Sequence, residues 1–356
     1  MHPFLIAENK RQSNLELLRI VAMIMILVYH TVYYVLYDYR TGAPIFSSLL
    51  ILLHIGVPLF VLISGYFGIK PTIKGFFRLY SILVFYNLLF YGIRLVNGDA
   101  LFTKTEFLRL WFPFSVGRRY WFFKVYIMLY MVSPILNYLT ENKKGGTLLF
   151  ISGVLTFYWG WFAHHPSLCD GKNVVNFVFL YLLGHYLRQH YSGEGNRRSR
   201  FVFLGAFLLL SSCVGIALYV SDARMMGILK RLFWGYNSPV LILISVLLFL
   251  TFTTFDFKNK LVNWVASSAF AVYLVHENHW FFRDQWYSLV ESQYLNNSGG
   301  LFAILLLSEC ALFFVLAILL DKFRSIIFLP LMPLGNWLQK HSDLVCMRIK
   351  TQISRR

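Results

Sequence analysis

Apolar segments long enough to cross a lipid bilayer recur along the whole sequence, and this pattern constrains the fold more than any other feature. A helix needs about 20 apolar residues to span a hydrocarbon layer roughly 30 Å thick. Charged residues and clusters of Gly, Pro and Asn separate the segments. We therefore expect an all-α, polytopic membrane helical bundle of about ten transmembrane helices. The expected spans are residues 17–37, 46–67, 76–96, 121–140, 147–164, 173–190, 201–221, 237–255, 260–282 and 301–320.

The composition also favours a membrane protein. Hydrophobic residues make up 58% and aromatic residues 19% of the chain, which is more apolar surface than a soluble domain of this length can bury. We expect residues 1–320 to form one transmembrane domain. Residues 321–356 are expected to form a basic cytoplasmic tail along the membrane surface, because Pro330 and Pro333 interrupt an eleventh span.

The formal net charge of +17 is typical of a membrane chain whose basic residues record its topology, and we expect no nucleic-acid partner. Lysine and arginine are concentrated in the tail and in alternate loops, which predicts that both termini lie in the cytoplasm. The even number of spans agrees with this orientation. The four cysteines have no paired or CxxC spacing, and we infer neither a disulfide framework nor a metal site from them.

Two ionisable side chains lie in the first span. Arg19 and His30 are eleven residues apart, a rotation of about 20° beyond three full helical turns, so both side chains face the same way. They are roughly 16 Å apart along the axis, about half of the hydrocarbon thickness. Arg19 alone could be an anchor at the inner interface, paired with Glu16 one turn earlier. Intramembrane ionisable groups usually mark function, however, and we favour a functional role for the two together.

Two further groups of residues lie at membrane boundaries. Lys74 and Arg78 open the third span, where they either bind phosphate or satisfy the positive-inside bias. The stretch "GRRYWFFKVY" contains Arg118, Arg119 and Trp121. An aromatic belt with snorkelling charges explains such a run, and a sugar-binding platform is the alternative. We favour the sugar platform, because the two arginines lie outside against the charge rule.

The ninth span carries "VYLVHENHWF". Tyr273, His276 and His279 recur at helical spacing, with Glu277 beside them. Two histidines three residues apart could bind a metal, but no third ligand is fixed by the sequence, and we predict no metal site. The residues are more consistent with the outer side of a substrate pathway.

Several blocks in order along the chain resemble the membrane acyltransferases of the acyltransferase-3 family. That family's first helix carries an arginine, ten intervening residues and a histidine, as in "RIVAMIMILVYH". The resemblance continues in "VPLFVLISGYFGIK", "KGFFRLY", "RRYWFFKVYIMLYMVSPILN", "FLYLLGHYLRQH" and "SSAFAVYLVHENHWF". One departure is visible at "RLYS", where many relatives have two arginines three residues apart and only Arg78 carries over.

The resemblance implies an acyltransferase that moves an acyl group, usually acetyl, from cytoplasmic acyl-CoA (acetyl-CoA) to a hydroxyl of a sugar or cell-surface glycan. It also implies an integral protein of the bacterial cytoplasmic (inner) membrane, with membrane lipids around it. We expect His30 and Arg19 to be catalytic, with His30 acting as general base or transient acyl carrier. The acyl donor is assigned to Arg19, Lys74 and Arg78, and the acceptor side to Arg118, Arg119, Trp121, Tyr273, His276 and Glu277.

A glycan or lipid-linked sugar transporter or flippase is the alternative function. It would also need aromatic residues and a histidine within the membrane. Proton-coupled transport predicts acidic relay residues within the spans, and only Glu277 and Glu309 are candidates. A structural or sensory protein would give no shared reason for the alignment of Arg19 with His30.

Overall fold

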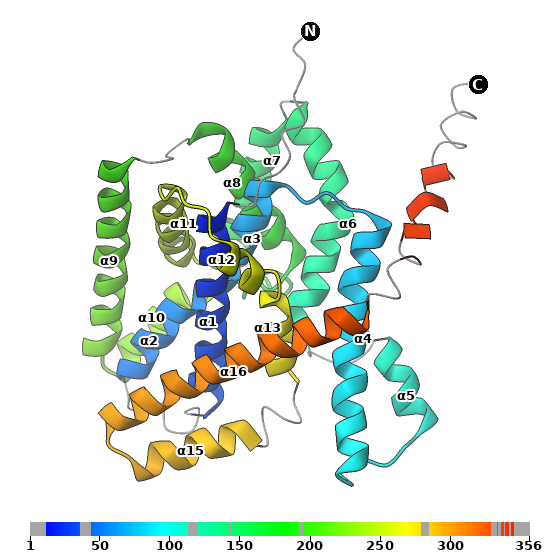
Figure 1. The fold of residues 1–356 in the computed structure, drawn as a ribbon. Coiled ribbons are helices and arrows are strands. Elements are labelled where there is room, and N and C mark those ends of the chain that lie inside the picture. Colours follow the sequence, from blue (N-terminus) through cyan, green and yellow to red (C-terminus); the bar gives the residue numbers. More distant parts are fainter. Residues whose placement is uncertain are drawn as a thin grey trace, which may run out of the picture. The chain divides into compact units, whose positions relative to one another are not determined.

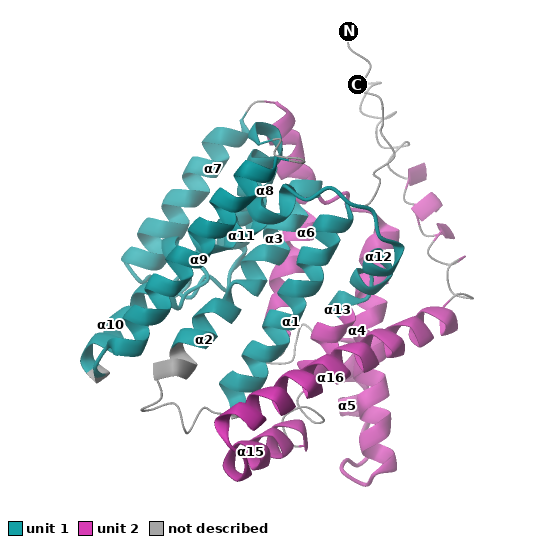
Figure 2. Cartoon of the chain, turned by 60° about the vertical axis from the view of Figure 1, so that its left-hand side comes forward, with its two compact units in different colours: residues 1–68, 144–270 teal, residues 69–143, 271–356 magenta. Residues whose placement is uncertain are grey.

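The computed structural model describes residues 12–35, 44–112, 120–142, 144–191, 196–278 and 285–328, with short stretches of 333–344. This described part is 83% helix and contains no strand, which confirms the all-α prediction (Figure 1). Contacts divide the chain into two compact units. Unit 1 comprises residues 1–68 and 144–270, and unit 2 comprises residues 69–143 and 271–356 (Figure 2).

Seven helices in the described part are long and apolar enough to cross a membrane, and the chain is a membrane protein. These candidate spans are Ser13–Tyr34, Ser48–Phe67, Ile73–Val96, Trp121–Glu141, Gly145–Phe162, Arg197–Val220 and Gly299–Ile327. Each coincides with one of the ten predicted segments. The other three predicted segments fall on shorter helices, so the number ten and the cytoplasmic position of both termini stay predictions.

Each of the three shorter segments has a feature that keeps it from being one long apolar helix. Helix α8 (Val174–His190) ends in basic residues, and α11 (Pro239–Thr253) is apolar but only 15 residues long. The predicted ninth span is divided into α12 (Lys260–Ala266) and α13 (Ala269–His276). The Ser267 hydroxyl between them donates to the Trp264 carbonyl at 2.7 Å, and such local side-chain bonds compete with helix continuation.

Unit 1 is built around α1 (Ser13–Val35) and α3 (Gly56–Phe67), shown in teal in Figure 2. Helix α1 packs against α2 (Pro44–His54), α3, α11 and α12. Helices α2 and α3 form one candidate span that is interrupted at Ile55. Pro58 explains the interruption, because a proline cannot donate to the carbonyl four residues earlier and its ring collides with that carbonyl. The remaining elements are α7 (Gly145–Val154), the π-helix η2 (Leu155–Phe162), α9 (Arg197–Val220) and α10 (Ala223–Phe233).

Two glycines allow α3 and α8 to approach closely. A Cβ atom on Gly65 would lie 2.0 Å from the Tyr181 carbonyl oxygen, and one on Gly184 would lie 2.3 Å from the Leu62 carbonyl oxygen. Small residues let membrane helices bring their backbones together. Gly65, in the "SGY" stretch, is therefore a packing residue.

Two arginines of unit 1 cap helix C-termini. Arg188 donates to the carbonyl oxygens of Tyr66 and Phe67 at 3.0 and 3.3 Å, at the end of α3. Arg200 donates to the Thr254 carbonyl at 2.9 Å, at the end of α11, and its guanidinium lies 4.1 Å from the centre of the Phe255 ring. Cations stabilise the carbonyl end of a helix. These arginines therefore have a structural role in addition to any role in topology.

Unit 2 contains α4 (Ile73–Val96), α5 (Lys104–Trp111), α6 (Trp121–Glu141), most of α13, α15 (Tyr287–Asn296) and α16 (Gly299–Ile327). Helix α6 fixes the start of α4. The Tyr130 hydroxyl donates to the Thr72 carbonyl at 2.9 Å and accepts from the Thr72 amide at 2.8 Å. The side-chain amide of Asn137 donates to the Ile69 carbonyl at 2.8 Å. Residues 69–72 are thereby held against α6.

An ion pair is buried at the end of α16. Arg324 Nε lies 2.8 Å from Asp321 Oδ1, and the two residues are only 5% and 4% exposed. The Tyr86 hydroxyl on α4 donates to the same carboxylate at 3.4 Å. The pair and the tyrosine join α16 to α4 within unit 2.

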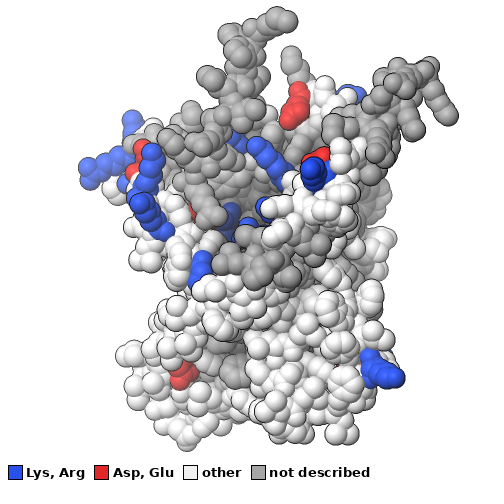
Figure 3. Space-filling view, turned by 45° about the vertical axis from the view of Figure 1, so that its right-hand side comes forward, with Lys and Arg blue, Asp and Glu red and all other residues white. Residues whose placement is uncertain are grey.

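Much of the surface is apolar, as expected of a protein surrounded by lipid. Only 17% of the most apolar part of α9 is buried inside the protein, against 67% for α2 and α3 together. The face drawn in Figure 3 is mostly uncharged, with its Lys and Arg side chains gathered in patches. Soluble monomers seldom expose such apolar area.

Candidate active site

Arg19 and His30 lie on the single uninterrupted helix α1. Met23 and Ile26 lie between them on the same stripe and are only 2% and 6% exposed. His30 itself is 9% exposed. This stripe of α1 therefore faces protein and not the acyl chains of the surrounding lipid, as intramembrane ionisable residues generally do.

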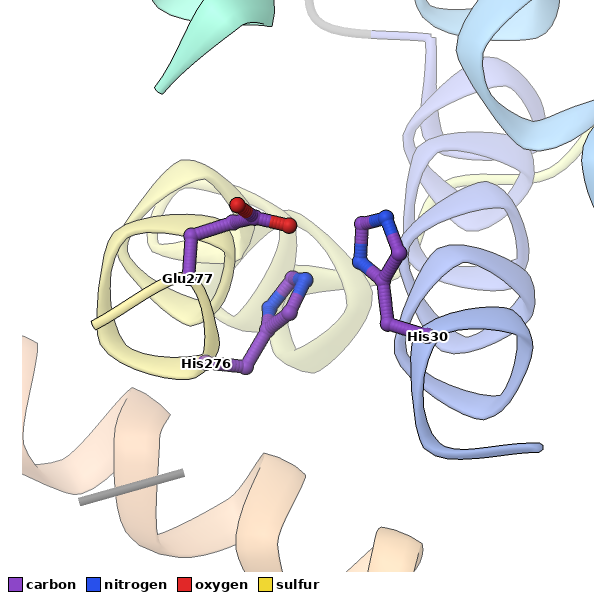
Figure 4. Close-up of side chains that lie close together, drawn as sticks. All are labelled: His30, His276 and Glu277. Atoms are coloured by element: carbon purple, nitrogen blue, oxygen red, sulfur yellow. The ribbon is translucent and has the colours of Figure 1, made fainter. Parts of the chain in front are cut away.

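The surroundings of His30 are aromatic. Its ring centre lies 5.4 Å from that of Tyr29 and 5.9 Å from that of Tyr34. Tyr29 in turn contacts Tyr33 and His54, at 5.5 and 4.8 Å between ring centres. Figure 4 shows the His30 imidazole projecting from α1. Contact with these rings restricts the orientations that the imidazole can adopt, which a catalytic base requires.

Arg19 is paired with Glu16, as the interpretation of Arg19 as an interfacial anchor expected. Arg19 Nη1 lies 2.6 Å from Glu16 Oε2, and the two side chains are 27% and 7% exposed. The carboxylate orients one edge of the guanidinium. Arginine has five N–H donors, so an orientated Arg19 can still bind a second anion.

The first turns of α4 carry Lys74 and Arg78, four residues apart and both exposed. Thr72 caps this helix by accepting from the Gly75 amide at 2.9 Å. The Lys74 ammonium donates to Asn336 Oδ1 in the C-terminal segment at 2.7 Å. A helix N-terminus with two cations on one face attracts anions such as phosphate.

Tyr273, His276 and Glu277 lie at the end of α13, where the first two are 3% exposed. His276 Nδ1 lies 2.7 Å from the Val272 carbonyl oxygen. A carbonyl can only accept, so this contact assigns the proton of a neutral ring to Nδ1 and its lone pair to Nε2. Figure 4 shows the His276 and Glu277 side chains at consecutive positions. The prediction that they bind no metal stays a prediction.

The stretch before α6 is partly described. Arg118 and Arg119 lie outside the described residues, and Trp121 is half-buried at the first position of α6. Tyr120 is 1% exposed and adopts the left-handed conformation, with φ 54°. Its hydroxyl donates to Asn87 Oδ1 at 3.3 Å and its ring centre lies 6.3 Å from that of Tyr273.

A family model described as an acyltransferase domain matches residues 12–322, nearly the whole chain. The chain belongs to the acyltransferase-3 family. No curated protein and no solved structure matches it.

Membership of the acyltransferase-3 family makes this chain an acyltransferase enzyme. The match begins before α1 and ends within α16, so it includes every helix that carries a predicted site residue. An acyltransferase needs an acyl donor and an acceptor substrate. The structure places Arg19 and His30 on one helix of unit 1, Lys74 and Arg78 on one helix of unit 2, and Tyr273, His276 and Glu277 on one helix end of unit 2.

His54 is a buried polar residue that no sequence motif marks. It ends α2, is 5% exposed, and stacks on Tyr236 with ring centres 4.0 Å apart. Its Nδ1 is buried and has no hydrogen-bond partner in the described part of the chain. His54 and Tyr236 are far apart in the sequence and meet only in the folded chain. No residue spacing in the sequence therefore indicates this pair. The position of His54 within the predicted second span was the available signal.

Proposed function

We propose that this acyltransferase transfers an acetyl group from acetyl-CoA in the cytoplasm to a hydroxyl of a sugar or cell-surface glycan. The observation that carries the proposal is the alignment of Arg19 with His30 on the buried stripe of α1. We place the chain in the cytoplasmic membrane of a bacterium, where cytoplasmic acyl-CoA and an envelope glycan are on opposite sides.

The acyl donor is bound by cations near the cytoplasmic ends of the spans. Arg19, orientated by Glu16, donates to a phosphate oxygen of coenzyme A. Lys74 and Arg78 contribute further charge at the N-terminus of α4, and Lys74 exchanges its bond to Asn336 for one to phosphate.

His30 acts on the acceptor hydroxyl. As general base it takes the hydroxyl proton, the oxygen forms a bond to the acyl carbon, and the carbon–sulfur bond of the thioester breaks. The leaving thiolate takes up a proton and departs as coenzyme A. The products are an ester and a thiol, so no further reactant is needed.

The acceptor sugar is bound by aromatic and polar groups. Sugars stack their apolar faces on aromatic rings, for which Trp121 and Tyr273 are candidates. Arg118, Arg119, His276 and Glu277 supply hydrogen bonds to hydroxyl groups. The Nε2 lone pair of neutral His276, assigned by its Nδ1 contact with Val272, accepts from a hydroxyl.

The proposal is tested by measuring the masses of envelope glycans from cells with and without the gene. We expect glycans from cells with the gene to carry mass increments of one acetyl unit that are absent without it. Complementation with the His30→Ala variant should leave these increments missing. Identical glycan masses in all strains would contradict a glycan acceptor.

A further inference from the structure

Helix α10 (Ala223–Phe233) is short, amphipathic and connects two long apolar helices, α9 and α11. Asp222 caps it by accepting from the Met225 amide at 2.8 Å. Met225, Ile228 and Leu232 recur at three- and four-residue spacing and are 48%, 50% and 37% exposed. They form one apolar face that remains about half exposed in the described part of the protein.

Two arginines border this face, and a lysine lies opposite it. At about 100° per residue, Arg224 and Arg231 point within roughly 20° of one another and about 40–60° from Ile228, whereas Lys230 points about 160° from Ile228. Residues 223–233 contain no acidic side chain. A helix with an apolar face, a basic face and little overall hydrophobicity is suited to the plane of a membrane interface.

Hydrogen bonds to η2 and to His164, two residues after η2, hold the end of α10 beside the end of η2. The Trp161 indole donates to the Leu232 carbonyl at 3.0 Å, and Arg231 Nε donates to His164 Nε2 at 2.7 Å. The end of η2 exposes Tyr158, Trp159 and Phe162 by 58%, 48% and 67%. Aromatic rings of this kind collect at the head-group level of a bilayer, and α10 is bonded to the same turn.

We propose that α10 is an interfacial helix that binds the head group of an anionic phospholipid through Arg224, Lys230 and Arg231. Its apolar face enters the acyl-chain region, while the basic residues remain at the level of the lipid phosphates. Charge complementarity identifies the occupant, because three cations outnumber the single carboxylate of the capping Asp222 and attract an anionic lipid more than a zwitterionic one. This proposal does not depend on acyl transfer.

The bound lipid would also be coupled to the aromatic residues around His30, because the residue that follows α10 contacts them. Trp234 comes directly after the helix, and its ring centre lies 6.2 Å from those of Tyr29 and Tyr33 and 5.6 Å from that of His54. A head group that holds α10 in place therefore holds this aromatic cluster in place.

A photo-crosslinker on α10 tests the proposal locally. Gly227 is exposed and a Cβ atom there meets no atom within 4 Å, so a cysteine carrying benzophenone can replace it, with the four native cysteines changed to alanine. The purified chain is placed in vesicles of equal phosphatidylcholine and phosphatidylglycerol, illuminated, and analysed by mass spectrometry. We expect phosphatidylglycerol to be captured at least about tenfold more often, given about 1 kcal/mol per basic residue near the surface.

The variant Arg224→Gln/Lys230→Gln/Arg231→Gln should lose this preference while still capturing lipid. A matched variant, Arg197→Gln/Arg198→Gln/Lys258→Gln, removes three charges near the opposite ends of α9 and α11 and should keep it. Equal capture of the two lipids by the parent chain would overturn the proposal. Capture of a second copy of the chain, or of no lipid at all, would overturn it as well.

Discussion

At the scale of single residues, the alignment of Arg19 and His30 required only helical geometry, and the sequence predicted it. A Glu16–Arg19 pair belonged to the alternative interpretation of Arg19 as an interfacial anchor, because residues three apart on a helix are neighbours, and the structure contains this pair at 2.6 Å. The burial of His54 against Tyr236 and the bond of Lys74 to Asn336 could not be predicted. Each joins residues far apart in the chain, and helical periodicity carries no information on such pairs.

Replacing Arg19 tests its assignment to the acyl donor. Arg19→Ala should raise the KM for acetyl-CoA by about 10- to 100-fold, because a charge-assisted hydrogen bond contributes roughly 1.5–3 kcal/mol. Arg19→Lys should recover part of the loss, since it keeps the charge without the planar donor fork. Steady-state kinetics at varied acetyl-CoA concentration measure the KM of both variants.

The control for Arg19 is Arg197→Ala, which removes an arginine from the start of α9. We expect its KM for acetyl-CoA to match that of the parent enzyme. A normal KM in Arg19→Ala, with the protein correctly inserted, would show that Arg19 does not bind the donor.

At the scale of helices, apolar segments predicted where helices lie but not where they break. Pro58 in the first turn of α3 explains the interruption at Ile55. The division between α12 and α13 falls at two serines within an apolar stretch, and serine is also common inside membrane helices. The amphipathic helix α10 was missed, because a search for continuous apolar segments passes over helices whose apolar residues lie on one face.

The close approach of α3 and α8 gives a prediction about stability. Gly65→Ala places a methyl group 2.0 Å from the Tyr181 carbonyl oxygen, so the helices must separate, and overpacking typically costs about 1–3 kcal/mol. We expect a lower Tm in detergent, measured by intrinsic fluorescence.

Gly205→Ala is the matched control. It also replaces a helical glycine, but its Cβ meets no atom within 4 Å. Alanine favours helix over glycine by about 1 kcal/mol, so its Tm should be unchanged or higher. Equal Tm values for the two variants would contradict the tight packing of α3 on α8.

The ion pair that joins α16 to α4 gives a second prediction about stability. Asp321→Ala leaves the Arg324 guanidinium buried without its carboxylate, which should destabilise the protein by about 3–5 kcal/mol. Asp321→Leu/Arg324→Met removes both charges and should recover most of the loss. Thermal unfolding of the two variants compares them, and equal destabilisation would show that the buried charge is not the cause.

At the scale of the whole molecule, composition and apolar segments predicted an all-helical membrane protein. In the residues that the structure describes, all regular elements are helices and seven of them are long and apolar enough to cross a membrane. The division into two units, each assembled from separate stretches of the chain, was not predicted. Single-sequence patterns identify spans but do not show which spans pack together. Membership of the acyltransferase-3 family was predicted from short blocks in order, and the match over residues 12–322 confirms it.

The orientation in the membrane is a prediction at this scale. The distribution of basic residues places both termini in the cytoplasm. A fluorescent protein that matures only in the cytoplasm should fluoresce at either terminus, and alkaline phosphatase, active only outside, should be inactive at both. Active phosphatase at only one terminus would mean an odd number of spans. Active phosphatase at both termini would mean that the chain is inserted in the opposite orientation.

The central claim is that His30 carries out acyl transfer from acetyl-CoA, and purified protein tests it most directly. Radiolabelled acetyl-CoA and an envelope-derived glycan are incubated with the parent enzyme, His30→Ala and His190→Ala, the last removing an exposed histidine at the end of α8. We expect labelled glycan and stoichiometric release of coenzyme A from the parent and His190→Ala. The rate with His30→Ala should be lower by at least about 10²–10⁴-fold. Full transfer by a correctly folded His30→Ala variant would contradict the claim.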